Sequence, residues 1–195
     1  MVMDALSGDV NAVGSKVFAL RERMKSLRES IYSGIEGRIK ALKFGGFRSV
    51  PSNWEIRHKN GGKISFGGMQ NIIDMKGTFE YKYFLMEEAA RTKQSTLDTL
   101  GPTLRGVTGA EIWAVWNPES SNDPMSLEFI IPYQSTLDRD GIYKDDYHMI
   151  IKVGFEDNPW FMHDQSLREE YEKDLEKKND GRMSVARFNH IWHGM

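Results

Sequence analysis

The 195-residue sequence contains no cysteine. This absence excludes a disulfide framework, a cysteine-ligated zinc site and a thiol nucleophile. Long apolar segments are also missing, because no run approaches the roughly 20 residues that a membrane-spanning helix needs, and the N-terminus has no secretory signal pattern. We therefore expect a soluble, cytoplasmic protein that has no membrane partner.

Neither sign of charge is in large excess. The formal net charge is −2, and 39% hydrophobic with 28% charged residues is an ordinary balance for one globular domain with a sizeable core. A contact with nucleic acid therefore requires a local cluster of Lys and Arg. The cations that gather in one expected helix are Lys25, Arg28, Arg38, Lys40 and Lys43. This basic region either contacts DNA or another subunit, or it is a solvated helix face.

A well-formed phosphate-binding loop, Gly-x-x-x-x-Gly-Lys-Ser/Thr, is absent from the sequence. The nearest match is GDVNAVGSK at residues 8–16, which ends in Gly14-Ser15-Lys16 and lacks the Gly-Lys-Ser/Thr order. It also leads directly into an expected strand, whereas a phosphate loop opens a helix whose N–H groups and dipole face the anion. We interpret this segment as a chance match.

Hydrophobic patterns predict strands that alternate with helices, which is typical of an α/β fold with a mostly parallel sheet. The segments expected as strands are 16–20, the two arms of a hairpin within 54–68, 81–86, 111–117 and 147–155. The segments expected as mainly helical are 21–46, 87–104 and 164–179, with at most a short helix in 183–195. Residues 120–129 are turn-rich at first, and 130–146 are expected as a loop with one short element. We expect a loose N-terminus over 1–15 and one domain over 16–195.

Two of these helices have a clear apolar face. In the first, the residues at helical spacing are Leu27, Ile31, Ile35, Ile39 and Leu42. In the helix over 164–179, Leu167, Tyr171 and Leu175 share a face and Asp164 is the predicted N-cap. These faces are expected to pack on the core.

The stretch YKYFLMEEAA places Glu87 and Glu88 directly after an apolar run. Tyr81 to Met86 lacks clean alternation, as is typical of a strand buried on both faces of a parallel sheet. Ligand sites in open α/β sheets lie at the carboxyl ends of strands. Two carboxylates there can share the work of phosphate cleavage, one near Mg²⁺ and one on the attacking water. The alternative is that both glutamates open a helix, where acidic residues suit the dipole.

A second apolar run also ends in a polar residue. EIWAVWN finishes at Asn117, and Pro118 stops the strand. A polar tip on a neighbouring strand is where a P-loop ATPase places a sensor of the γ-phosphate. The alternative is an ordinary Asn-Pro turn.

Taken in order, several segments resemble the large terminase subunit of tailed bacteriophages, in its N-terminal ATPase domain. FLMEEAARTKQSTLDTLGPTLR is similar to that family's Walker B strand and following helix, and AEIWAVWNPES to its coupling motif. The other similar segments are LRERMKSLRESIYSGIEGRIK, IIKVGFEDNPWF and ARFNHIWHG. The similarity covers about residues 16 to 194, and its strength lies in five motifs in the right order.

The resemblance implies a role for each matching residue. Glu87 is the carboxylate on the Mg²⁺ side, Glu88 is the catalytic base, and Asn117 senses the γ-phosphate and couples hydrolysis to movement. Arg105, which precedes the coupling strand, is a candidate for cofactor binding or for a structural or subunit-contact role. The implied cofactors of the complete protein are ATP and Mg²⁺.

The resemblance also implies partners and a fold. The partners are double-stranded DNA, the portal protein, the small terminase subunit and further copies in a ring, in the cytoplasm of the host. The fold is P-loop NTPase-like, of the RecA/ASCE type, but the sequence is expected to lack the first strand, the phosphate loop, the first helix and the nuclease domain. The chain alone is therefore expected to be inactive. The alternative is a non-catalytic fragment or split gene product that binds DNA or partner subunits.

Overall fold

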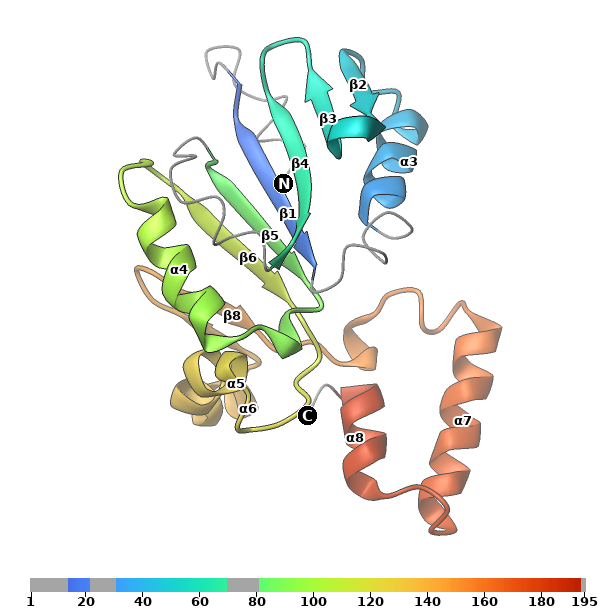
Figure 1. Ribbon diagram of the computed structural model, residues 1–195. Coiled ribbons are helices and arrows are strands. Elements are labelled where there is room, and N and C mark those ends of the chain that lie inside the picture. The colour runs from blue at the N-terminus through green and yellow to red at the C-terminus, as the bar shows by residue number, and fades with distance from the viewer. Residues whose placement is uncertain (1–13, 22–30, 70–80, 194–195) are drawn as a thin grey trace. The chain divides into compact units, whose positions relative to one another are not determined.

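The computed structural model describes residues 14–21, 31–69 and 81–193. The chain divides into two compact units, Met1–Trp116 and Asn117–Met195, and each unit is described by itself (Figure 1). Within the described ranges, no helix combines the length and the apolar character that crossing a membrane requires.

A six-stranded sheet is the centre of the first unit (Figure 1). Its strands are β1 (Lys16–Arg21), β2 (Phe47–Val50), β3 (Glu55–His58), β4 (Lys63–Gly68), β5 (Tyr83–Glu87) and β6 (Glu111–Val115). They lie in the order β2-β3-β4-β1-β5-β6. Strands β4, β1, β5 and β6 are parallel to one another, while β2, β3 and β4 pair antiparallel. This mostly parallel sheet flanked by helices confirms the predicted α/β fold class.

The helix predicted over 21–46 is confirmed in its described part. Helix α3 (Ser33–Ala41) follows β1 in the chain, and residues 22–30, including Leu27, lie outside the described residues. Ile31 and Ile39 are buried as predicted, whereas Leu42 is 58% exposed. Leu42 is the C-cap residue, so it has left the helical face that buries the other two.

Strand β1 supplies side chains to both faces of the sheet, because successive residues of a strand point in opposite directions. Val17 and Ala19 belong to a buried cluster with residues of α3, β3 and β4, whose members are Val17, Ala19, Ile31, Tyr32, Ile39, Ile56, Ile64 and Phe66. Phe18 alternates with them, and its ring meets Tyr81 edge-on at a centroid distance of 5.2 Å. β1 is therefore covered on both sides, as a central strand of a parallel sheet should be.

The strand predicted at 81–86 is confirmed, but its burial differs from the prediction. β5 begins at Tyr83 and includes Glu87. Phe84 and Met86 are buried, whereas Tyr83 and Leu85 are partly exposed, so burial alternates along the strand. The sequence does not reveal this alternation, because the buried and the partly exposed positions of the strand both hold apolar side chains.

The predicted hairpin is confirmed by β3 and β4. His58 donates its backbone N–H to the carbonyl of Gly62 at 2.8 Å, and the Asn60 side chain accepts from the Gly62 N–H at 2.9 Å. Gly61 has φ of +89°, a conformation that favours glycine. The Asn-Gly-Gly sequence therefore forms the predicted turn, with glycine at the position that needs a positive φ.

The second unit begins with short elements: α5 (Pro124–Phe129), η5 (Ile131–Tyr133), α6 (Gln134–Asp140), β7 (Ile142–Lys144) and β8 (Met149–Ile151). The prediction of turns over 120–129 and of a loop with one short element over 130–146 thus underestimated the regular structure in this region. Pro124 lies in the first turn of α5, and Gly141 ends α6 with φ of +71°. The strand expected at 147–155 exists only over three residues, and β8 pairs antiparallel with β7 in a separate two-stranded sheet.

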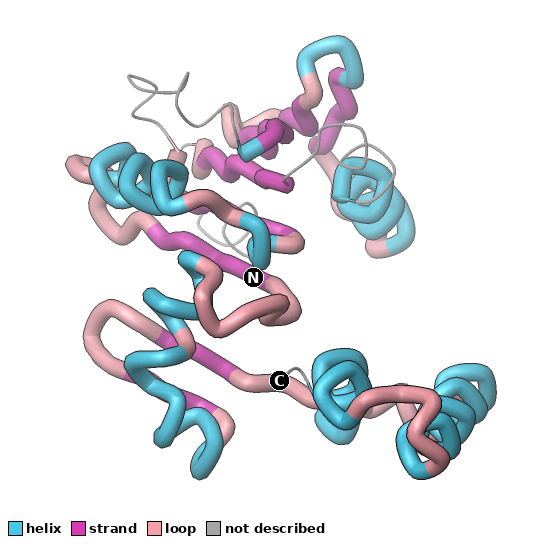
Figure 2. The backbone as a smooth tube through the Cα atoms, turned by 60° about the horizontal axis from the view of Figure 1, so that its bottom comes forward, coloured by secondary structure: helices cyan, strands magenta, loops and turns pink. Residues whose placement is uncertain are grey.

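Two helices complete the second unit and lie side by side in Figures 1 and 2. They are α7 (Gln165–Asn179) and α8 (Val185–His193), after a 3₁₀ turn η6 (Phe155–Asp157). As predicted, the Asp164 side chain accepts a hydrogen bond from the Leu167 N–H at 3.0 Å and caps α7. The buried cluster between the helices contains Met183, Phe188 and Trp192, with Leu167, Tyr171 and Leu175 packed against it, so the predicted apolar face of α7 is confirmed.

Candidate functional site

The carboxyl ends of three neighbouring strands meet at one edge of the sheet. In the parallel register, Arg21 of β1 pairs with Glu87 of β5, and Glu87 pairs with Val115 of β6 (Figure 1). Glu87 is the last residue of an interior strand, because β5 lies between β1 and β6. This is the edge at which open α/β sheets bind ligands.

The two adjacent glutamates do not begin an α-helix. Glu87 belongs to β5, and Glu88 has left-handed backbone angles of φ 54° and ψ 44°. A single 3₁₀ turn, η4 (Ala89–Arg91), follows, and α4 (Gln94–Leu104) begins only at Gln94. The alternative of an acidic helix start is therefore wrong, and the helix predicted over 87–104 is shorter than expected. The chain turns at Glu88, and the next residue, Ala89, is buried.

Arg21 is the residue of this edge that sequence reasoning missed. Its Nε donates to Glu88 Oε2 at 2.9 Å, its Nη2 donates to Glu88 Oε1, and its Nη1 lies 3.4 Å from Glu87 Oε2. The Arg21 side chain is 12% exposed, compared with 40% for Glu87 and 61% for Glu88. The sequence contains a signal for this residue. Arg21 is the first polar residue after the apolar run Val17 to Leu20, just as Glu87 is the first after the apolar end of the segment that forms β5.

The ion pair changes the acidity of both partners. The hydrogen bond from Arg21, with the charges of Arg21 and Arg91, holds the pKa of Glu88 below its ordinary value. The hydrogen bond to Glu88 raises the pKa of Arg21, outweighing the opposing effect of burial. The shift therefore acts in the acidic range only, and at neutral pH Glu88 is an ionised acceptor that can hold and orient a water molecule.

The other two predicted site residues lie in different places along the chain. Asn117 is exposed and is the second residue after Val115, the residue that pairs with Glu87. Arg105 is the C-cap of α4 and is exposed, six residues before β6 begins. Strand β6 ends beside Glu87 and begins at the amino ends of the parallel strands. Arg105 precedes the start of β6, so along the chain it belongs to the amino ends of the strands and not to the carboxyl ends.

The glycine segment before β1 has a packing explanation. Gly14 has φ of +65°, and a Cβ at that position would meet the backbone of Gly61 at 2.9 Å. Gly14 and Ser15 then lead into β1 at Lys16, so this segment opens a strand. Residues 8–13 of GDVNAVGSK lie outside the described residues, so the interpretation of this segment as a chance match stays a prediction.

The strand-end carboxylates fit a hydrated Mg²⁺ better than a closed metal cage. Within the described ranges, no group of three or more His, Asp or Glu side chains could hold a metal ion. Mg²⁺ usually keeps several waters and takes one or two carboxylates together with phosphate oxygens. Glu87, which is 40% exposed, can supply one such carboxylate.

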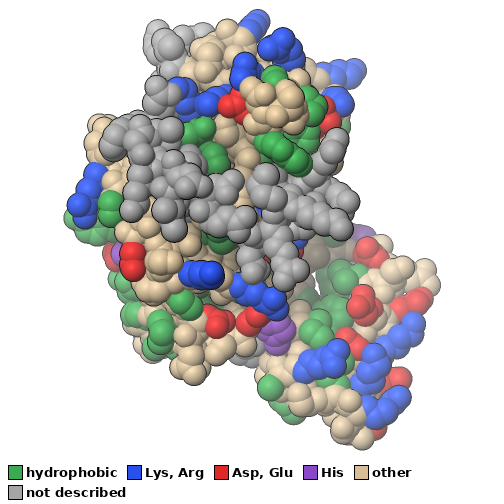
Figure 3. Space-filling model, in the orientation of Figure 1, with side chains coloured by type: hydrophobic (Ala, Val, Ile, Leu, Met, Phe, Trp, Pro, Cys, Tyr) green, Lys and Arg blue, Asp and Glu red, His purple; other side chains and the backbone are tan. Residues whose placement is uncertain are grey.

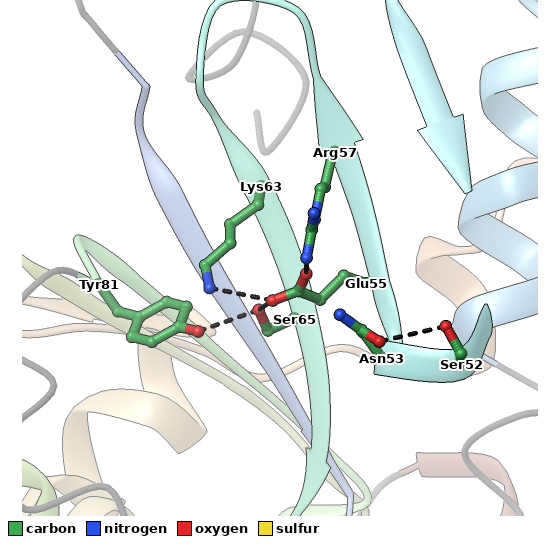
Figure 4. Close-up of polar contacts among 7 residues, drawn as sticks. All are labelled: Ser52, Asn53, Glu55, Arg57, Lys63, Ser65 and Tyr81. Atoms are coloured by element: carbon green, nitrogen blue, oxygen red, sulfur yellow. Dashed lines mark hydrogen bonds and ion pairs between the residues drawn. The ribbon is translucent and has the colours of Figure 1, made fainter. Parts of the chain in front are cut away.

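A separate polar cluster lies on the β3–β4 hairpin and is centred on the buried Glu55 (Figure 4). Glu55 accepts hydrogen bonds from Arg57 Nε at 2.7 Å and from Lys63 Nζ at 3.0 Å, and the Tyr81 hydroxyl donates to Ser65 Oγ at 2.9 Å. Burial raises the pKa of Glu55, but the hydrogen bonds from Lys63 and Arg57 outweigh it and leave the pKa lowered. Its polar atoms partner one another, so we read this cluster as structural.

The predicted basic region is solvent-exposed where the structure describes it. Arg38, Lys40 and Lys43 are exposed, and Lys25 and Arg28 lie outside the described residues. Figure 3 shows Lys and Arg side chains gathered at the end of the first unit that holds β2 and the C-terminus of α3. On the second unit, the same view shows acidic and basic side chains interspersed over α7 and α8.

Comparison with known protein families gives one match. The family described as phage terminase large subunit matches residues 5–190 of the chain. The comparison with curated protein sequences gave no match.

Solved structures with a similar fold include large terminases and a DNA packaging motor. The large terminase of a thermophilic bacteriophage, in complex with ADP, has a TM-score of 0.61 and 16% identity, and the match covers 88% of this chain and 40% of that protein. The ATPase domain of the Thermus phage P74-26 large terminase has a TM-score of 0.61 and 13% identity, with coverages of 99% and 80%. The Phi-28 gp11 DNA packaging motor has a TM-score of 0.54 and 16% identity, with coverages of 92% and 57%. At these identities the likeness shows the fold, and the chain spans about 40% of the length of the ADP-bound terminase.

Proposed function

The chain belongs to the phage terminase large subunit family, and from this membership we propose that it is the ATPase portion of a DNA-packaging motor. The motor couples ATP hydrolysis to translocation of double-stranded DNA into the procapsid. One observation carries this proposal: two adjacent acidic residues, Glu87 and Glu88, lie at the carboxyl end of an interior parallel strand. Asn117 follows the adjacent strand.

The two glutamates divide the chemistry between them. ATP and Mg²⁺ supply the reactive phosphate and the charge that stabilises it. Glu87 holds the metal side, through water, as its moderate exposure allows. Glu88 is ionised at neutral pH, with its pKa held below the ordinary value by Arg21, and it orients the attacking water and accepts its proton.

Asn117 is proposed to couple hydrolysis to movement. Its carboxamide contains both a donor and an acceptor, so it can contact a phosphate oxygen and report its loss. It is also the first residue of the second compact unit, separated by one residue from the end of β6, the strand that pairs with β5. A shift of the Asn117 backbone on phosphate loss would therefore move the first residue of the second unit.

The partners that this function requires are double-stranded DNA, the portal protein, the small terminase subunit and further copies of the chain in a ring, in the cytoplasm of the host. The net charge of −2 restricts DNA contact to local basic surface. The exposed Arg38, Lys40 and Lys43 are the candidates within the described residues.

A second candidate is a non-catalytic module that keeps the fold and binds DNA or partner subunits. The observation that favours it is the close approach of Gly14 to the backbone of Gly61, just before the segment opens strand β1. Under this alternative, the strand-end glutamates have no role in turnover.

A paired assay of phosphate release and DNA packaging tests the proposal. In the intact protein, we expect Asn117→Ala to retain part of its ATP hydrolysis and to lose DNA packaging, because hydrolysis and movement are uncoupled. Glu88→Gln, the hydrolysis-deficient reference, should lose both. If the unaltered intact protein neither releases phosphate nor packages DNA, the motor assignment is wrong and the non-catalytic alternative is favoured; if both variants behave like the parent, the roles of Glu88 and Asn117 are wrong.

A further inference from the structure

Arg21 links the ends of two strands that are far apart in the sequence. It is the last residue of β1, and its register partner on β5 is Glu87. The three guanidinium nitrogens are all directed at the two carboxylates: Nε and Nη2 at Glu88, and Nη1 at Glu87, at 3.4 Å. The side chain is mostly buried, with 12% exposed, so it is a fixed part of the edge of the sheet.

Glu88, by contrast, has little else to hold its side chain. The side chain is 61% exposed, so packing does not determine its direction. Its backbone has left-handed angles, which a residue with a side chain adopts only when the surroundings impose them. Among the described residues, Arg21 donates the side-chain hydrogen bonds that hold the Glu88 carboxylate, and the charge of Arg91 adds to them.

We propose that Arg21 is the positioning residue of the catalytic base, which aligns the Glu88 carboxylate for the attacking water. This inference rests on the proposed function. The planar guanidinium matches the two carboxylate oxygens in one plane. A carboxylate has about four lone-pair sites, so two hydrogen bonds from Arg21 leave sites that accept from water. The third nitrogen, beside Glu87, sets the separation between the base and the metal-side carboxylate.

A double-mutant cycle separates this role from direct contact with the nucleotide. In the intact protein, we expect Arg21→Gln to lower the single-turnover rate of ATP hydrolysis by about 10²-fold, the size of effect that misplacement of a reacting group produces. The dissociation constant for ATP should stay within about twofold. In the Glu88→Gln background, Arg21→Gln should cost less than about twofold more, because the group that it positions is already inactive.

Arg21→Lys provides the conservative comparison. Lysine keeps the positive charge but is a point charge without the planar fork, so we expect it to lose about 10-fold or more of the hydrolysis rate. Parent-like hydrolysis by Arg21→Gln would overturn the inference. So would a large rise in the dissociation constant for ATP with the rate unchanged, or a loss of the same size in the Glu88→Gln background; both outcomes place Arg21 on the nucleotide.

An NMR measurement on this chain tests the contact without any turnover. In the ¹⁵N-labelled chain, the Arg21 Nε–H resonance should shift in Glu88→Gln and stay in place in Glu170→Gln, an exposed glutamate of α7. An unchanged resonance in Glu88→Gln overturns the positioning role even if the packaging function stands. Conversely, the proposed function itself fails if the unaltered intact protein neither hydrolyses ATP nor packages DNA, a result that leaves the Arg21–Glu88 contact measurable by NMR, so the two failures are distinguishable.

Discussion

The strained backbone at Glu88 shows how much of the site is decided by single residues. A left-handed conformation costs a residue with a Cβ about 1–2 kcal/mol, and the structure has this conformation at Glu88. The acidic pair at the end of an apolar run could be predicted from the sequence. The left-handed turn could not, because glutamate is not a residue that favours it. Arg21 was missed because it is 67 positions from Glu88 in the chain, and no local pattern joins them.

Glu87→Gln should raise the Mg²⁺ requirement of hydrolysis before it lowers the maximal rate. The proposed role of Glu87 is on the metal side through water, and loss of such an outer contact weakens metal affinity by about 10- to 100-fold. The measurement is a Mg²⁺ titration of ATP hydrolysis by the intact protein. An unchanged Mg²⁺ midpoint would show that Glu87 does not act on the metal.

Glu55→Gln should destabilise the first unit by about 1–3 kcal/mol at neutral pH, because Lys63 and Arg57 lose their carboxylate partner. The pKa of Glu55 is lowered in the folded state, so its stabilisation is present above the ordinary glutamate value of 4.5 and is lost as pH falls through the folded pKa. The difference between parent and variant in denaturant unfolding should therefore shrink below about pH 4.5. A difference that grows on acidification contradicts this assignment, and Glu170→Gln is the control.

Whole elements were predictable where their signals are local. Helix α7 has its own cap at Asp164 and an apolar face of Leu167, Tyr171 and Leu175, and both are as predicted. Helix α5 was not predicted, and only one short element was expected where η5, α6 and β7 lie, because short segments depend on tertiary contacts more than on propensity. One such contact is the stacking of Tyr133 on Tyr143, with ring centroids 3.9 Å apart. The strand at 147–155 was recognised, but its partner β7 was not.

Asp164→Ala should destabilise the second unit by about 1 kcal/mol, because it removes the acceptor that satisfies the Leu167 N–H at the start of α7. Asp164→Asn is the matched control, since asparagine caps helices about as well as aspartate. Thermal unfolding followed by circular dichroism compares the three proteins. Equal midpoints for Asp164→Ala and the parent would mean that the cap contributes nothing to the stability of α7.

At the scale of the whole molecule, the order of motifs along the chain carried more information than any one motif. The predicted sequence of polar-tipped strands became the parallel neighbours β5 and β6, and the family match over residues 5–190 agrees with that reading. What the order of motifs could not give is the side-chain geometry at the strand ends, since it depends on the register between β1 and β5.

Single-turnover ATP hydrolysis by Glu88→Gln in the intact protein is the most direct test of the central claim, that Glu88 is the base of an ATPase. Glutamine keeps the size of the side chain but cannot accept the proton. We predict a loss of about 10²- to 10⁴-fold or more in the hydrolysis rate, with ATP binding retained and with Glu170→Gln at the parent rate. Hydrolysis by Glu88→Gln at the parent rate would contradict the account.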